Sequence, residues 1–143
     1  MDNHDQSMVD FTNELGVKAA KRLQEEYIIW LTTVSPSGVP QPNPVWFYWD
    51  GKILRIYSQP SSHKMRNISR NPKVSLNFHA NEDGGDIVVL AGTASIERHP
   101  PQHDPRYLQK YRNHIPEIGL TPESFAKSYS VLITITPDKL RGF

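Results

Sequence analysis

Three basic residues follow a predicted β-strand closely, and their spacing suggests an anion-binding site. The strand ends at Tyr57-Ser58, and a helix is predicted from Ser61 to Arg70 with serine as its cap. The first N–H groups of a helix have no partner within it, so they can bind an anion. Lys64 falls in the first turn, where the helix dipole does not favour a cation, and Arg66 and Arg70 add positive charge. A bound anion would explain this lysine, and a solvated basic helix would explain it equally well.

Other chemistries find less support. The chain has no cysteine, which excludes disulfides, thiolate metal sites and a cysteine nucleophile. His99 and His103 have helical ligand spacing, but the two prolines between them prevent a helix, so we expect no metal site. Tyrosines alternate with basic residues over 106–112, which we interpret as a solvated helix face rather than a nucleic-acid surface. No Gly-x-Ser-x-Gly or phosphate-cradling glycine motif is present.

The elements that must position Lys64 are mostly strands. Strands are predicted at 27–34, 39–50, 52–58, 73–79, 86–98 and 129–136, and helices at 9–26, 61–70, 106–114 and from Thr121 onward. Prolines at positions 40, 42 and 44 cannot donate to a ladder, so this half of the second strand should lie at an edge or be irregular. Gly92 should mark a bulge or a close approach of another backbone. Six strands in hairpin order predict a mainly β (α+β) fold, a six-stranded antiparallel barrel with short peripheral helices.

Composition predicts one globular domain. The 143 residues include 37% hydrophobic and 22% charged side chains, with a formal charge of +1. Mean hydropathy is −0.56. Residues 1–8 look like a flexible tail, and residues 9–143 form one domain. The start has no apolar signal segment, and no apolar run approaches a membrane span of about 20 residues. We therefore expect a cytoplasmic protein that contacts neither membrane nor nucleic acid.

Several short motifs, taken in order, resemble one known family. They are Tyr57-Ser58, Lys64-x-Arg66-Asn67-Ile68, Arg70-Asn71-Pro72, Gly84-Gly85-Asp86 and Gly92-Thr93-Ala94. Together they resemble the pyridoxamine 5′-phosphate oxidase-like FMN-binding split β-barrel superfamily, and within it the subgroup of probable F420-dependent enzymes. The resemblance covers roughly residues 20–143, and it is specific only as a set.

The resemblance implies a cofactor and the residues that hold it. The cofactor is FMN, with F420 as the alternative. Lys64 would contact its phosphate, helped by His63, Ser62 and Arg66, while Tyr57 and Ser58 would line the cofactor. In relatives the backbone of the second strand faces the flavin ring. Because prolines leave few N–H groups there, the ring contacts would come from Asn43, Val45 and Trp46.

The resemblance also implies a homodimer with the cofactor at the subunit interface and a small-molecule substrate. Apolar side chains at Trp46, Tyr48 and 87–90 offer surface for such an interface. We expect hydride transfer between the cofactor and an unknown small molecule, with unknown catalytic residues. Alternatives are a non-catalytic flavin carrier or stress sensor and a haem-handling relative. True pyridoxamine phosphate oxidases carry an Arg-x-His pair near the C-terminus, and no histidine follows Lys139, so pyridoxamine oxidation is not expected.

Overall fold

The computed structural model describes residues 9–143, so the expected tail at 1–8 lies outside the described residues. The elements are α1 (Glu14–Glu25), β1 (Ile29–Val34), β2 (Pro40–Val45), β3 (Tyr48–Trp49), β4 (Leu54–Ser58), α2 (His63–Arg70), β5 (Lys73–Asn77), β6 (Val88–Arg98), η1 (Pro101–His103), α3 (Pro105–Tyr111), η2 (Pro116–Ile118), α4 (Pro122–Ser128) and β7 (Val131–Gly142). The fold is α+β and mainly β, as predicted. Within the described residues, no helix is both long and apolar enough to cross a membrane.

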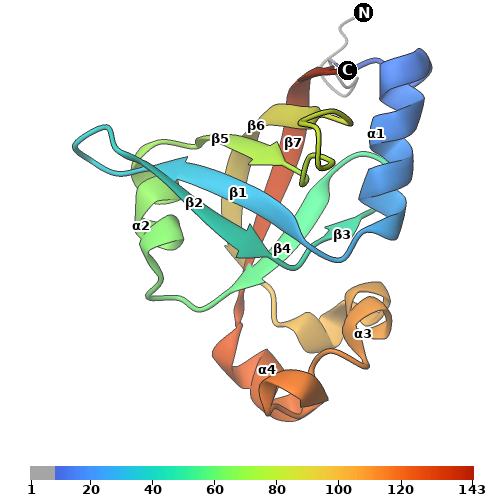
Figure 1. Ribbon diagram of the computed structural model, residues 1–143. Coiled ribbons are helices and arrows are strands. Elements are labelled where there is room, and N and C mark those ends of the chain that lie inside the picture. The colour runs from blue at the N-terminus through green and yellow to red at the C-terminus, as the bar shows by residue number, and fades with distance from the viewer. Residues whose placement is uncertain (1–8) are drawn as a thin grey trace, which may run out of the picture.

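All strand pairs are antiparallel and form one curved sheet in the order β2-β1-β5-β6-β7-β4-β3. Helices α3 and α4 lie together below one end of this sheet, α2 lies beside β1 and β2, and α1 runs along the opposite side (Figure 1). The ladder does not close, because β2 and β3 are edge strands.

The expected six strands are wrong in number, because the predicted strand 39–50 divides into β2 and β3. The break falls at Trp46 and Phe47. There the Phe47 backbone N–H donates to the Tyr111 hydroxyl at 2.8 Å, and that hydroxyl lies 2.9 Å from the Phe47 carbonyl. A backbone group that bonds a side chain is withdrawn from strand pairing. Helix α3 therefore decides where the second strand ends.

The alternating pattern of this segment is nevertheless confirmed. Val45, Phe47 and Trp49 are buried in the main core between the sheet and α1 and α2. Trp46 and Tyr48 point the other way and pack against a second cluster built around α3 and α4. Two apolar clusters thus meet on opposite faces of the same short segment.

Two further predictions concern the long hairpin of β6 and β7. The bulge at Gly92 is confirmed, because the register shifts between Ala91 and Gly92, and a Cβ at 92 would lie 2.7 Å from the Thr136 carbonyl oxygen. The last strand, expected to end at Thr136, continues past Pro137 to Gly142. Pro137 lies opposite Gly92 at the bulge, where its missing N–H interrupts an already irregular ladder.

Candidate functional site

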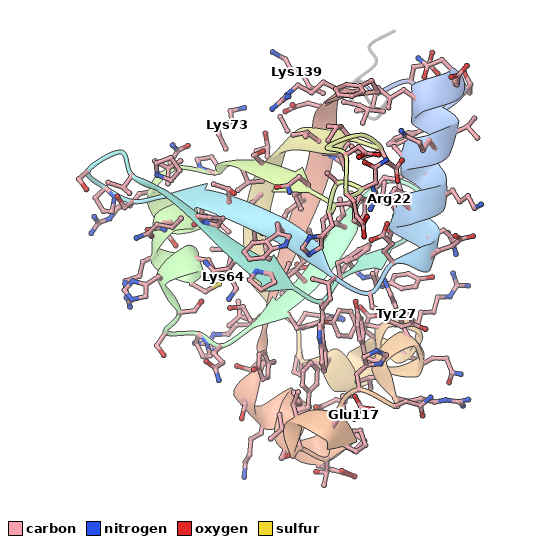
Figure 2. The ribbon with its side chains drawn as sticks, in the orientation of Figure 1. Arg22, Tyr27, Lys64, Lys73, Glu117 and Lys139 are labelled. Atoms are coloured by element: carbon pink, nitrogen blue, oxygen red, sulfur yellow. The ribbon has the colours of Figure 1, made fainter. Side chains whose placement is uncertain are left out.

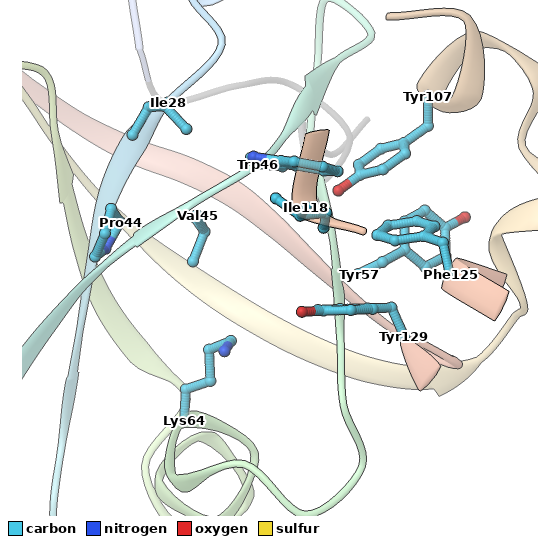
Figure 3. Close-up of a pocket in the computed structure, with 10 residues that line it drawn as sticks. All are labelled: Ile28, Pro44, Val45, Trp46, Tyr57, Lys64, Tyr107, Ile118, Phe125 and Tyr129. Atoms are coloured by element: carbon cyan, nitrogen blue, oxygen red, sulfur yellow. The ribbon is translucent and has the colours of Figure 1, made fainter. Parts of the chain in front are cut away.

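A cleft of about 360 Å³ opens where β2, β4, α2 and the α3–α4 region meet (Figure 3). Four of the predicted cofactor-binding residues line it: Val45, Trp46, Tyr57 and Lys64. A neighbouring hollow of about 390 Å³ is lined by three more, Asn43, Ser62 and His63, and again by Lys64. Lys64 therefore borders both spaces. The structure therefore places seven of the nine predicted residues around two adjoining spaces.

The remaining two predicted residues, Ser58 and Arg66, line neither space. Ser58 is fully buried, and its hydroxyl lies 2.9 Å from the Ser62 hydroxyl. Ser62 takes the N-cap position of α2 as predicted, but its side chain caps no backbone N–H. The first N–H groups of α2 thus keep their capacity to bind a ligand.

Arg66 bonds the protein instead of facing a hollow. Its guanidinium donates to the Ser61 carbonyl oxygen at 3.0 Å and lies 3.0 Å from His63 Nδ1. Because a guanidinium can only donate, His63 accepts at Nδ1 and carries its ring proton on Nε2. Arg66 therefore orients His63 rather than adding a free charge.

Helix α2 is fixed to the sheet by a buried amide. Asn67 is 3% exposed, and its Nδ2 donates to Thr33 Oγ1 at 2.9 Å and to Gln41 Oε1 at 2.7 Å. Met65 and Ile68 pack into the core beside it. The start of α2, and Lys64 with it, is thereby held against β1 and β2.

Lys64 is a half-buried cation without a counter-charge among residues 9–143. Its ammonium has no hydrogen bond or ion pair with any of residues 9–143, and burial lowers its pKa. In the view of Figure 2 it lies beside β2, below Lys73 and Lys139. Desolvation of an unpaired charge disfavours the charged form. An anion in the cleft or the hollow would offset that cost.

The wall opposite Lys64 is aromatic. Trp46 stacks on Tyr111 with ring centroids 4.6 Å apart and an interplanar angle of 4°, and on Phe125 at 5.7 Å. Phe125 in turn stacks on Tyr129 at 4.8 Å. Tyr107 completes this wall and is 1% exposed. Such a stack of flat rings suits a planar ligand.

Sequence reasoning missed most of this wall. The segment 106–112 was interpreted as a solvated helix face, and this is wrong for its tyrosines. Tyr107 and Tyr111 are buried, while Arg106 and Arg112 are exposed. The signal was present, since the two tyrosines are four residues apart and so lie on one helix face.

A buried carboxylate joins this wall to the sheet. Asp104 is 2% exposed and accepts from Arg55 Nε at 2.9 Å, from Arg55 Nη2 at 3.1 Å and from the Tyr57 hydroxyl at 2.9 Å. Burial alone would raise the pKa of Asp104, but the hydrogen bonds from Arg55 and Tyr57 outweigh it, so the pKa is lowered. Asp104 also caps α3 through the Tyr107 N–H.

A second set of contacts holds α3 against the break between β2 and β3. Lys110 Nζ donates to the Phe47 carbonyl oxygen at 2.7 Å and lies 3.7 Å from the Phe47 ring centroid. Burial lowers the pKa of Lys110 to about 8. The Tyr111 hydroxyl also donates to the Tyr27 carbonyl oxygen at 2.7 Å. Trp46, which precedes Phe47, is therefore fixed at the cleft.

The prolines of β2 limit the number of backbone N–H groups that this strand can donate. Pro40, Pro42 and Pro44 have no N–H, so the donors that pair β2 with β1 come from Gln41, Asn43 and Val45. Asn43 and Val45 thus present side chains, not backbone donors, to the two spaces.

A family model described as pyridoxamine 5′-phosphate oxidase matches residues 16–143. The chain belongs to this family. The match spans both spaces and nearly all of the described fold. No curated protein sequence matches the chain.

Solved structures of similar fold carry varied names. One titled F420 reductase is 27% identical with a TM-score of 0.68, covering 85% of this chain and 94% of its own. The haem storage protein HutZ from Vibrio cholerae is 16% identical, with a TM-score of 0.66 and coverage of 91% and 95%. An FAD-binding protein from Mesorhizobium loti is 17% identical, with a TM-score of 0.65 and coverage of 87% and 88%. The last two likenesses concern the fold alone.

Proposed function

We propose that this oxidase-family protein binds a phosphate-bearing flavin or deazaflavin, FMN or F420, and uses it for hydride transfer with a small molecule. The observation that carries the proposal is Lys64, which lies half-buried between an aromatic cleft and a polar hollow and whose ammonium has no partner in the described part of the chain. The planar ring would occupy the cleft, and the phosphate would lie near Lys64, Ser62 and the His63 Nε2–H.

The residues present fit such a ligand. The cleft walls are aromatic and aliphatic, as expected for a flat ring system. The hollow carries a hydroxyl, an imidazole donor and an ammonium, which suit a phosphate. When bound, the cofactor supplies the hydride chemistry, while the protein binds it, orients it and excludes water. The similar structure titled F420 reductase supports F420 as a candidate beside FMN.

We further propose a homodimer with the cofactor at the subunit interface. Asn43 and His63 are exposed at the hollow, so one chain alone leaves that side of the site open to solvent. Trp46 and Tyr48, first considered as interface residues, already pack on α3 and α4 within one chain. The sheet face around Trp30 and Val89 remains for a second copy. Sedimentation at micromolar concentration should give about twice 16.4 kDa, and a monomer that binds cofactor would contradict the shared site.

The test of the proposed function is a fluorescence titration of the purified chain with FMN and with F420. We expect saturable binding of at least one of them, at about one site per chain. Turnover of a reduced nicotinamide or reduced F420 with an acceptor then separates an enzyme from a flavin carrier. Absence of binding at high micromolar concentration of both would refute the proposal, and a Soret band on adding haem would direct attention to a haem-handling role.

A further inference from the structure

Three tyrosines line the cleft, and the hydroxyl of Tyr129 is the one that lies toward Lys64 (Figure 3). The Tyr57 hydroxyl donates to Asp104 at 2.9 Å. Tyr107 is 1% exposed, and its ring packs edge-on against Tyr57 with ring centroids 4.7 Å apart. The Tyr129 hydroxyl has no hydrogen-bond partner in the described part of the chain, and it points into the cleft on the side of Lys64 (Figure 3).

The position of the Tyr129 ring is set by the protein itself. Tyr129 ends α4, and its backbone N–H donates to the Phe125 carbonyl oxygen at 2.8 Å. Its ring stacks on Phe125 with an interplanar angle of 18°, and Phe125 is 1% exposed. The hydroxyl is therefore presented in one direction, and a ligand that bonds it orders few additional rotamers.

We propose that Tyr129 is a specificity-determining binding residue whose hydroxyl hydrogen-bonds the polar edge of the planar ring in the cleft. This inference rests on the proposed function. The nearby walls at Pro44, Val45 and Phe125 offer no side-chain hydrogen bond, so an all-hydrocarbon ring would desolvate the Tyr129 hydroxyl without replacing its water. A ring bearing carbonyl oxygens or ring nitrogens restores the bond, because a phenol both donates and accepts. Lys64 then binds the anionic end of the ligand, and Tyr129 binds the polar edge of its ring.

The two roles predict different responses to two probes, FMN and lumiflavin, which carries the ring system without the phosphate side chain. Tyr129→Phe removes only the hydroxyl and should weaken both probes by the same factor, about three- to tenfold for one neutral hydrogen bond. Lys64→Met should weaken FMN by a larger factor than lumiflavin. Tyr48→Phe, a half-buried phenol outside the cleft, serves as the matched control and should bind both probes like the wild type.

Binding is measured by flavin fluorescence on the full chain, with thermal unfolding to show that each variant is folded. The near-ultraviolet absorption band of bound lumiflavin should also shift in Tyr129→Phe, because a hydrogen bond to the ring is lost. Wild-type affinity and an unshifted band in Tyr129→Phe would overturn the inference while leaving the proposed function intact. Equal weakening by Tyr48→Phe would overturn it too. Failure of the wild type to bind FMN, lumiflavin or F420 would instead refute the proposed function.

Discussion

Replacing Lys64 with methionine should change stability and binding in opposite directions. Methionine keeps much of the length and apolar stem but removes an ammonium that is half-buried and unpaired among residues 9–143. Because burial lowers the pKa of Lys64, the folded protein holds the charged form at a cost. Removing that charge should raise the free energy of unfolding of the ligand-free protein by about 0.5–2 kcal/mol.

The same substitution should weaken FMN. A hydrogen bond to a charged group contributes about 1.5–3 kcal/mol. Lys64 keeps part of its surface in water, which screens its charge, so the lower part of that range applies. The dissociation constant should therefore rise roughly 10- to 40-fold.

Urea unfolding of the ligand-free protein and an FMN titration measure the two effects. Lys52→Met, on the exposed turn between β3 and β4, is the control and should change neither quantity appreciably. A Lys64→Met protein that is less stable, yet binds FMN as the wild type does, would show that Lys64 is a structural residue. Equal loss of FMN affinity in Lys52→Met would show that the effect is one of general surface charge.

Three further predictions concern the contacts behind the cleft. Tyr111→Phe leaves the buried N–H of Phe47 without a partner and should lower the free energy of unfolding in urea by about 1–3 kcal/mol. Tyr27→Phe, at a residue that is 46% exposed, should have little effect. Asp104→Ala should lower the free energy of unfolding by about 1–3 kcal/mol in the same assay, because the Tyr57 hydroxyl loses its acceptor and Arg55 keeps only Asp50 at 3.4 Å. Since the pKa of Asp104 is lowered in the folded state, the contribution of its carboxylate to the free energy of unfolding is present above the unfolded pKa of about 4 and is lost as pH falls below it. The free energy of unfolding of Asp104→Asn should therefore fall less steeply in acid than that of the wild type. Burial lowers the pKa of Lys110 to about 8, so between that pH and the ordinary pKa of about 10.4 the unfolded chain binds more protons than the folded one. The free energy of unfolding of the wild type should therefore rise with pH over this range relative to that of Lys110→Met. A parallel pH dependence of the two proteins would contradict this.

Local patterns were sufficient for the elements around the hollow at the start of α2. Strand β4, the start of α2 and the edge position of the proline strand followed from turn residues, capping residues and the missing N–H of proline. Each of these signals depends on residues that are close together in the sequence, so it can be recognised without the structure. The position of Lys64 at the start of α2, beside Ser62, was therefore predictable, whereas His63 and Asn43 were named from the family resemblance.

The aromatic side of the site depends on contacts between distant parts of the chain. The break between β2 and β3 exists because the side chains of Lys110 and Tyr111 bond the backbone of Phe47, more than 60 residues earlier. No local pattern near Phe47 encodes those partners, and an uninterrupted strand was the natural prediction.

The sequence by itself determined the strand-rich antiparallel fold, the edge strand, the bulge at Gly92 and the position of Lys64 at a helix start, because each follows from backbone chemistry over a few residues. Only the tertiary structure decided how the hydroxyls of Tyr57 and Tyr129 are engaged. The Tyr57 hydroxyl bonds Asp104 within the protein, while the Tyr129 hydroxyl faces the cleft. Two phenols of the same type thus differ in role because hydrogen-bond partners are set by packing between elements, not by neighbours in the chain.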